Sequence, residues 1–322
     1  MIDTQPTPGP ATTPQGQGEP PGRGRRSKAT LSRSNERFAL ALLLPALIFV
    51  AALIAYPLFV AIQLSLTPGS FSALRETTGG VSLEHFVAVF SDRATLDELG
   101  RTAVYVVGTI VPAFAAGLMI ALLLRHRFAG RRWLRSLVLL PWAVPSVAAS
   151  AIFLWMLDGS LGIVNKVLSA LGLIDGPVAW YSSPDTAMAA VIVPTVWKQF
   201  PFFAMILLAA LQTVPNDLYE SAKVDGASRW RQFTTVTWPG IRGAAYAALV
   251  IGTLGVYREF DFIYPLTRGG PNDVTSTLAI SIYREAFQFS NMGFASALGI
   301  VSTLLAAVFV IFGGRIMARN NL

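Results

Sequence analysis

Six long apolar stretches constrain what this chain can fold into. A helix needs roughly 20 apolar residues to cross about 30 Å of hydrocarbon, and each stretch reaches that length. With 53% hydrophobic and only 13% charged residues, the chain is too apolar for an ordinary soluble domain. The sequence therefore predicts an all-α integral membrane protein with six transmembrane helices, near residues 38–66, 102–124, 136–157, 186–212, 240–264 and 293–316.

The positive charges predict the orientation of these helices. Loops that carry an excess of Lys and Arg remain on the cytoplasmic side of a membrane. One set of segments holds seventeen Lys and Arg residues, against seven in the opposite loops. We therefore expect a multi-pass protein with both termini in the cytoplasm, and we assign the net charge of +7 to topology rather than to a nucleic-acid partner. The basic segments are residues 1–37, 125–135, 213–242 and the C-terminal end.

The chain divides into a tail and a membrane domain. Residues 1–22 are rich in Pro, Gly, Thr and Gln, and residues 23–37 carry six Lys and Arg. Such a segment buries too little apolar area to order itself, so residues 1–37 are predicted to be a disordered basic cytoplasmic tail. Residues 38–322 are predicted to be one transmembrane domain. Within it, residues 82–99 mix apolar and acidic side chains, which favours an interfacial amphipathic helix, with a loose loop as the alternative.

A polar segment, residues 213–239, lies between the fourth and fifth apolar stretches. Asp217 is expected to cap a short helix, and Gly226 to end it in the left-handed conformation. Lys223 in the last turn complements the helix dipole. A second helical stretch over residues 228–238 is expected to close at Pro239. The alternative is a polar loop that merely joins two membrane helices.

The same residues match a known pattern. Glu220, Ser221 and Ala222, followed by Asp225, Gly226 and Ala227, resemble the EAA loop of permease subunits from binding-protein-dependent ABC importers. The resemblance implies that this segment is a cytoplasmic coupling helix, between transmembrane helices 4 and 5, that docks on an ATPase subunit together with Arg229. Ser221 replaces the usual alanine without removing the acidic residue or the glycine. A Leu-Thr-Arg-Gly-Gly-Pro segment at residues 266–271 resembles the carbohydrate, maltose-type branch of this family.

The resemblance also implies partners. It predicts one permease subunit of an ATP-driven importer that moves a sugar or related polyol across a bacterial cytoplasmic membrane by alternating access. Its partners would be a second permease subunit in a heterodimer, ABC ATPase subunits, an extracytoplasmic solute-binding protein or lipoprotein, the sugar, and membrane lipid. None of the four lysines follows the Gly of a phosphate-binding loop, so ATP and Mg are expected on the partner ATPase, with no cofactor in this chain. The alternative is a secondary carrier or channel without an ATPase.

Polar groups at membrane depth are the first candidates for a substrate path. Lys198 and Gln199 lie about twelve residues inside the fourth stretch, roughly 18 Å from its outer end at ~1.5 Å per residue. Pro194 and Pro201 flank them and are expected to kink and break the helix near the midplane. The alternative is a structural lysine that snorkels or pairs with a carboxylate of the fifth stretch.

The end of the fifth stretch is the second candidate. Tyr257, Arg258, Glu259 and Asp261 offer hydrogen-bonding groups and an aromatic face, which are the groups that hold hydroxyl-rich ligands. The alternative is an Arg258–Glu259 ion pair at the outer interface. A further possibility is that Arg258 selects an acidic or phosphorylated sugar. Trp142 and Trp155 are expected to be aromatic residues at the membrane interface.

Enzyme and metal sites are not predicted. The chain has no cysteine, and its two histidines, His85 and His126, are expected on opposite sides of the membrane, too far apart to share a metal. No nucleophile with a matching base can be named. We therefore expect a transport subunit with no catalytic residue and no metal site.

Overall fold

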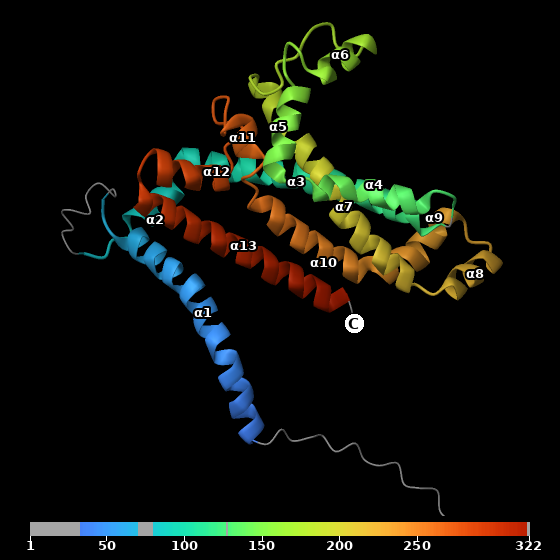
Figure 1. Cartoon of the computed structure of the whole chain (residues 1–322), viewed down its shortest axis with the longest axis horizontal. Helices are drawn as coiled ribbons and strands as arrows, with labels where there is room; N and C mark the ends of the chain where they lie inside the picture. The colour runs from blue at the N-terminus through green and yellow to red at the C-terminus, as the bar shows by residue number, and fades with distance from the viewer. Residues whose placement is uncertain (1–32, 70–79, 127, 321–322) are drawn as a thin grey trace, which may run out of the picture. The chain divides into compact units, whose positions relative to one another are not determined.

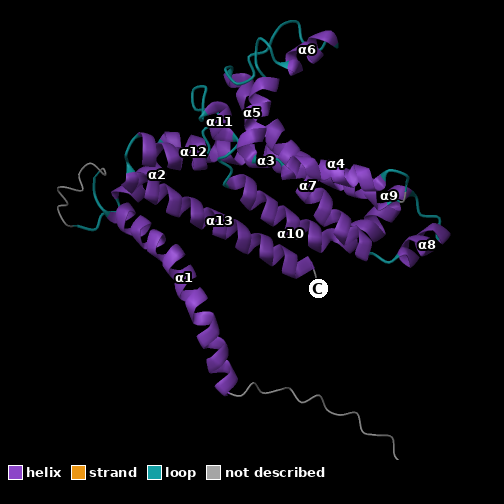
Figure 2. Cartoon of the chain, in the orientation of Figure 1, coloured by secondary structure: helices purple, strands orange, loops and turns teal. Residues whose placement is uncertain are grey.

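The computed structural model describes residues 33–69, 80–126 and 128–320. Helices and connecting loops account for all of these residues, without any strand (Figures 1 and 2). Two compact units divide the chain, residues 1–55 and 56–322, and the second carries the functional candidates. Five helices are long and apolar enough to span a membrane, or six when one bent pair counts as a single span. The predicted all-α membrane fold is confirmed at this level.

The first helix, α1, spans Arg33–Leu66 and contains the whole predicted first stretch. Most of the predicted disordered tail lies outside the described residues. Its last five positions, residues 33–37, belong to α1, so the prediction of disorder is wrong there. The helix begins early because no proline or glycine stands between Arg33 and the apolar run that follows.

The predicted amphipathic helix over residues 82–99 is two elements. α2 spans Glu84–Ser91, and α3 starts directly afterwards and spans Arg93–Arg125. Asp92 separates them, because its backbone is extended and its carboxylate accepts from the N–H groups of Ala94 and Thr95, both at 3.3 Å. This side-chain cap satisfies donors that a helix start leaves unpaired. The second membrane helix therefore begins nine residues earlier than predicted.

The predicted third span is not one straight helix. It consists of α4, Arg131–Ala143, and α5, Ser146–Met156, which meet at 95°. Val144 adopts an extended backbone, with φ −73° and ψ 130°, immediately before Pro145. The residue before a proline avoids the helical region, and proline itself offers no N–H, so the helix ends there. Trp142 and Trp155, on either side of this break, are both largely exposed.

A small unit follows the bent pair. α6 spans Ile163–Ala170, and the loops around it are held by Asn165. The Asn165 amide nitrogen donates to the carbonyls of Gly159 and Val178, each at 2.9 Å, and its oxygen accepts from the Trp180 indole at 2.8 Å. Asp158 turns the chain into this unit by accepting from the N–H groups of Ser160 and Leu161 at 2.9 and 2.7 Å.

α7, Pro184–Thr213, packs along α3 and forms the centre of the core. The predicted break in this helix is wrong, because α7 runs without interruption through both Pro194 and Pro201. Both prolines are buried, and neighbouring helices hold the segment in place. Gly117 of α3 allows the close approach, since a Cβ there would lie 2.5 Å from that of Phe203.

The C-terminal half adds two long helices and several short elements. α10 spans Trp238–Tyr257, so the predicted fifth span ends seven residues early, and α13 spans Met292–Asn320 and contains the predicted sixth span. Between them lie α11, Ile263–Thr267, α12, Leu278–Tyr283, and the π-helical turn η3, Arg284–Gln288. α10 packs on α7, α3 and α13.

The Gly-Gly-Pro segment forms a partly buried turn after α11. The hydroxyls of Thr267 and Thr275 lie 2.7 Å apart, and the Thr275 hydroxyl also donates to the Gly270 carbonyl at 2.8 Å. Gly269 has φ +94°, and a Cβ there would lie 3.1 Å from Ile280. Only glycine fits that backbone and that space without strain. The turn therefore fixes the direction in which the chain leaves α11.

Candidate functional site

The polar segment contains the short helix that the sequence predicts. α8 spans Asn216–Val224 and carries Lys223 in its last turn. Gly226 follows with φ +72°, and its N–H donates to the Lys223 carbonyl at 3.0 Å. The predicted cap is wrong, because Pro215 occupies the capping position and Asp217 lies inside the first turn without a capping bond. Pro215 precedes the first turn, and Asp217 contributes only its negative charge near the positive end of the helix dipole.

One side chain holds α8 against the rest of the protein. Tyr219 is buried, and its hydroxyl lies 3.0 Å from that of Thr237. The guanidinium of Arg125, at the end of α3, lies 3.7 Å from the centre of the Tyr219 ring, within cation–π range. Gln232 adds a bond from its amide to the Ala227 carbonyl at 2.8 Å. Tyr219 therefore connects α8 to Thr237 and to the end of α3, and Gln232 holds the turn that follows α8.

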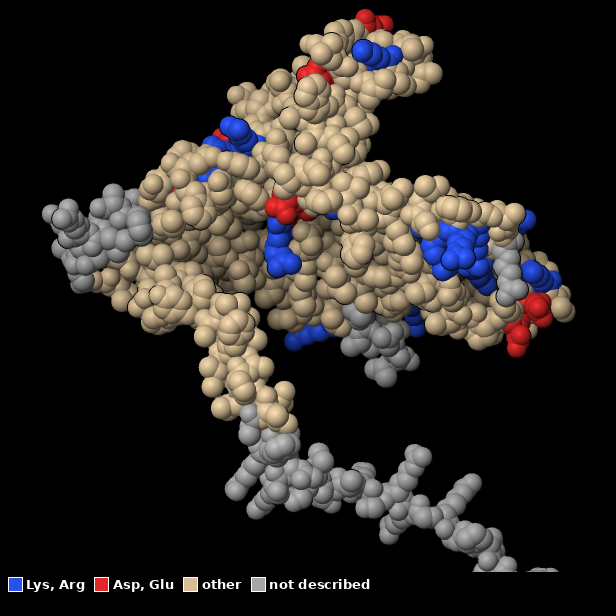
Figure 3. All heavy atoms as spheres, in the orientation of Figure 1, with Lys and Arg blue, Asp and Glu red and all other residues tan. Residues whose placement is uncertain are grey.

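The remaining faces of α8 are open. Glu220, Ser221 and Asp225 are exposed, and they line a shallow depression together with Asp217 and Val224. Figure 3 shows the acidic side chains of this end of the molecule beside a dense group of basic ones. A larger cleft opens between α8 and α3, with a volume of about 1090 Å³. Its charged lining residues are Arg125, Glu220, Lys223 and Arg229, and His126 also lines it.

The second helical stretch does not close at Pro239. α9, Arg229–Gln232, continues through a π-helical turn, η2, Phe233–Thr237, directly into α10. The Trp238 N–H donates to the Phe233 carbonyl, five residues back, which widens the turn just before Pro239. A proline ring clashes with the carbonyl four residues earlier in a regular helix, and the wider turn gives it room.

Lys198 and Gln199 are half-buried on α7. The Lys198 ammonium donates to the carbonyl of Val144, at the break between α4 and α5. Val144 has an extended backbone just after α4, so its carbonyl lies outside the helical hydrogen-bond pattern and can accept this donor. No Lys198–carboxylate ion pair forms in the described part of the chain. Gln199 contacts α10, with its amide nitrogen 3.5 Å from the place of a Cβ on Gly252.

The four candidates at the end of α10 have different surroundings. Tyr257 donates its hydroxyl to the Ser302 carbonyl of α13 at 3.1 Å. Arg258 is exposed and donates to the Leu254 carbonyl at 3.4 Å. Glu259 is half-buried and accepts from the Phe262 N–H at 3.1 Å, and Asp261 is exposed. The alternative of an Arg258–Glu259 ion pair is wrong, since Arg258 turns back along its helix.

An aromatic cluster was missed in the sequence. Phe260 and Tyr264 stack at 4.9 Å between ring centres, and Tyr283 packs against both, at 4.9 and 4.8 Å. Phe287 extends the cluster at 5.1 Å from Tyr283. Both pairs have the i, i+4 spacing that brings rings together on a helical turn, and that spacing is the signal that could have found them.

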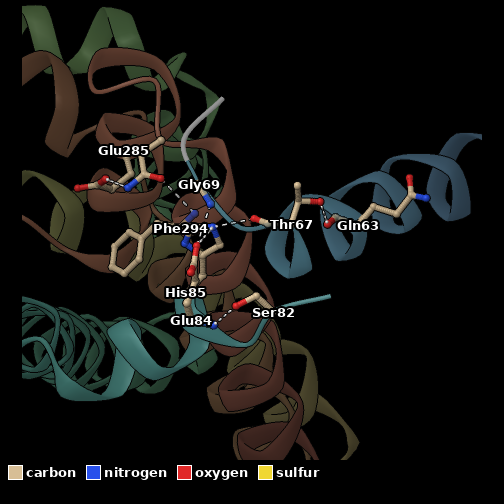
Figure 4. A network of polar contacts seen from close by, with 9 residues as sticks. Gln63, Thr67, Gly69, Ser82, Glu84, His85, Glu285 and Phe294 are labelled. Atoms are coloured by element: carbon tan, nitrogen blue, oxygen red, sulfur yellow. Dashed lines mark hydrogen bonds and ion pairs between the residues drawn. The ribbon is translucent and has the colours of Figure 1, made fainter. Parts of the chain in front are cut away.

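The two histidines do not form a site together. The ring nitrogen of His85 lies 3.1 Å from the Thr67 carbonyl, and its neighbour Glu84 accepts from the Gly69 N–H at 2.8 Å (Figure 4). The pair fixes the start of α2 to the end of α1, which is a structural role. No group of three or more His, Cys, Asp or Glu residues lies close enough to hold a metal in the described ranges.

Sequence comparison places this chain among transport proteins. Residues 113–320 match the family described as the binding-protein-dependent transport system inner membrane component. The sulfoquinovosyl glycerol transport system permease protein of Agrobacterium fabrum is 35% identical over 86% of this chain and 89% of its own length. The trehalose/maltose transport system permease protein of Thermococcus litoralis is 38% identical over 61% of this chain and 65% of its own.

Structural comparison agrees with the sequence matches. A chain in the crystal structure of a bacterial ABC transporter involved in the import of the acidic polysaccharide alginate superposes with a TM-score of 0.76. The two chains are 26% identical, and the match covers 89% of this chain and 96% of the other. The likeness therefore extends over nearly the whole fold described above.

Proposed function

The chain belongs to the family of binding-protein-dependent transport system inner membrane components, and from this premise we propose that it carries a sugar or related polyol across a bacterial cytoplasmic membrane. It is the permease subunit of an ABC importer. Support for a sugar comes from relatives named for trehalose and maltose, for sulfoquinovosyl glycerol and for alginate. The proposed assembly has a second permease, ATPase subunits that bind ATP and Mg, and an extracytoplasmic binding protein or lipoprotein.

The observation that carries the coupling role is the construction of α8. One face is fixed by the buried Tyr219, while Glu220, Ser221 and Asp225 are exposed. A helix that is rigidly attached yet openly charged is suited to receive another protein. We assign it to the ATPase as the coupling helix, together with Ala222, Gly226, Ala227 and Arg229.

The bent pair α4 and α5 completes the membrane topology in this proposal. Counted as one span, it gives six crossings, with the basic segments and both termini in the cytoplasm. The segment 213–239 then lies on the cytoplasmic side, where an ATPase can reach it. Residues 38–322 act as one permease domain, and ATP binding by the partner moves α8 and switches access to the interior.

The substrate path is proposed to run past Lys198 and Gln199 toward the end of α10. Lys198 and Glu259 are both half-buried, and Arg258 and Asp261 are open to a ligand. Tyr257 lines the path and is held by α13 through its hydroxyl. The exposed Arg258 favours an acidic sugar as a second candidate, because a guanidinium binds carboxylate or sulfonate oxygens through paired hydrogen bonds.

Uptake into vesicles tests the proposal. The full importer is reconstituted, the binding protein is loaded with candidate sugars, and uptake is measured with ATP, without ATP, and with vanadate. Uptake that requires ATP and stops with vanadate is the expected result. Uptake that ignores both treatments would instead identify a secondary carrier or channel.

A pair of variants tests α8 directly. Glu220→Ala should abolish binding-protein-stimulated ATPase activity, since the exposed carboxylate is lost from the docking face. Asp185→Asn, an exposed acid in the first turn of α7, serves as the matched control and should leave the activity unchanged. Normal uptake with Glu220→Ala would reject the coupling role.

A further inference from the structure

A second face of α8 lines the cleft that opens toward α3. Asn216, Tyr219 and Lys223 stand on this face at i, i+3 and i+7 and line the cleft. The shallow depression, where the ATPase is proposed to dock, is lined instead by Asp217 and its neighbours on the open face. The cleft and the proposed docking face are therefore different faces of one helix, and they meet at Glu220.

The cleft carries an excess of positive charge. Arg125 of α3, Lys223 of α8 and Arg229 of α9 line it. The side chain of Glu220 is the single carboxylate among the lining residues. None of the three cations forms an ion pair or a side-chain hydrogen bond with a residue that the structure describes. Three cations against one carboxylate leave an excess of two positive charges, which a dianion would balance.

Arg125 is positioned to receive such a ligand. The carbon of its guanidinium lies over the Tyr219 ring, 3.7 Å from the ring centre, and that ring is buried. A guanidinium over an aromatic face keeps its in-plane N–H groups for other acceptors. Paired N–H groups of this kind match two oxygens of a phosphate. The contact with Tyr219 therefore fixes the guanidinium without using its donors.

The remaining lining indicates the size and polarity of the ligand. A volume of about 1090 Å³ lies at the upper end of the range of small-molecule sites. Asn216 and Gln232 contribute amides, and His126 contributes an imidazole, all of which can bind hydroxyl groups. Leu122 and Phe233 are the lining residues whose side chains are wholly apolar. The cleft therefore suits a polar, soluble molecule better than an acyl chain.

We propose that this cleft binds a small, soluble phosphate monoester that also carries hydroxyl groups. A phosphate monoester has a charge of about −1.5 to −2 near pH 7 and three acceptor oxygens. Arg125 and Lys223 bind the phosphate oxygens, and Arg229 adds positive charge. Asn216 and Gln232 bind the hydroxyls. The ligand bridges α3 and α8, and the proposal does not depend on docking of an ATPase on the other face.

Calorimetric titration of the purified full-length chain, in micelles of a neutral detergent, tests the proposal. The two probes are glucose 6-phosphate and glucose. Glucose 6-phosphate should bind at least about tenfold more tightly, because glucose lacks the charged oxygens. Lys223→Gln should weaken its binding about tenfold, the worth of one charge-assisted hydrogen bond. Arg231→Gln, an exposed arginine of α9 outside the cleft lining, is the matched control and should leave the affinity unchanged.

A second variant separates binding from folding. Arg125→Lys keeps a cation that can lie over the Tyr219 ring and loses the paired N–H groups. It should weaken binding of glucose 6-phosphate about threefold and melt like the wild type. Equal binding of both probes, unchanged affinity in Lys223→Gln, or equal weakening by Arg231→Gln would overturn the proposal.

Two competition experiments identify other occupants. Phosphatidylglycerol is added to the micelles, and in a separate titration the assembled importer replaces the single chain. Glucose 6-phosphate should still bind in both cases. Its displacement by phosphatidylglycerol would overturn the proposal and assign the cleft to a lipid. Loss of binding in the assembled importer would overturn it and assign the cleft to the ATPase.

Discussion

The α8 region and the Lys198–Glu259 region both place charge where a ligand could meet it, and they do so in opposite ways. α8 exposes its acidic side chains and fixes itself through a single buried ring, that of Tyr219. Around Lys198 and Glu259 the charged groups are half-buried, and each already has a backbone partner, Val144 or Phe262. The first region has polar groups free for another protein, while the second has polar groups that also hold the fold together.

This difference determines what mutations can reveal. A substitution on the open face of α8 changes contacts with a partner and leaves the internal fold alone. A substitution at Lys198 or Glu259 removes an internal bond along with any contact to substrate. The second region therefore needs pairs of variants that keep the internal bond and change the charge, or the reverse.

The largest effect is expected from the anchor of α8. Tyr219→Ala removes a buried ring, and losses of that kind cost about 3–5 kcal/mol. α8 should then detach, and co-purification of the ATPase should fall at least tenfold. Tyr219→Phe removes only the bond to Thr237, worth about 1 kcal/mol, and should retain most of the ATPase. Equal retention by both variants would mean that the ring does not position α8.

Lys198 is expected to come next. Lys198→Met keeps the apolar stem and removes the donor, so substrate-stimulated ATPase activity should fall about tenfold, the worth of one charge-assisted hydrogen bond. Lys198→Arg keeps a charged donor for the Val144 carbonyl and should retain part of that stimulation. ATPase co-purification should be normal for both. If Lys198→Met keeps full stimulation and only lowers the melting temperature, the lysine is structural.

Glu259 should give a smaller effect. Glu259→Gln retains an oxygen that can accept from the Phe262 N–H and removes the charge beside Lys198. The substrate concentration for half-maximal ATPase stimulation should rise about fivefold, while thermal stability changes little. If Asp261→Asn, whose carboxylate is exposed, raises that substrate concentration equally, then negative charge at this end of α10 matters rather than the position of Glu259.

Asp158 belongs to neither region and should give the smallest effect. Backbone hydrogen bonds from Leu161 and Ser160 lower the pKa of its carboxyl. The folded pKa is therefore below the unfolded value, so the contribution is present above the usual aspartate range and is lost as the pH falls below about 3.9. The protection factors of the Ser160 and Leu161 amides, corrected for intrinsic exchange at each pH, should be high at pH 6 and should fall as the pH drops through the folded pKa of Asp158. In Asp158→Asn, that pH dependence should vanish while ATPase stimulation stays normal.

The sequence predicted the elements whose causes are local. The end of α8 follows from Gly226, which alone accepts the required backbone, and the membrane helices follow from runs of apolar residues. The bend before Pro145 also had a local cause, but the apolar run continued through it and concealed the break. A hydropathy pattern indicates how long an apolar run is, but it does not show whether the helix axis bends within that run.

The prolines show why other features could not be predicted. Pro194 and Pro201 leave α7 continuous because packing on α3 holds the helix, and Pro239 is accommodated by a π-helical turn. A proline in the sequence shows only that one backbone N–H donor is missing. The tertiary packing around it decides whether the helix breaks, widens or continues. The partners of Lys198 and Tyr219 lie 54 and 18 residues away, so no local pattern could name them.

The π-helical turn before Pro239 has a mechanical consequence. Because η2 joins α9 to α10 without a hinge, residues 229–257 form one rod of 29 residues, about 44 Å long at ~1.5 Å per residue. Thr237 of this rod contacts Tyr219 of α8, Gln232 bonds to Ala227 just after α8, and the C-terminal end of the rod leads directly to Glu259. A continuous helix of this kind moves as one body, so a tilt imposed at one membrane face also displaces the end of the helix at the other face.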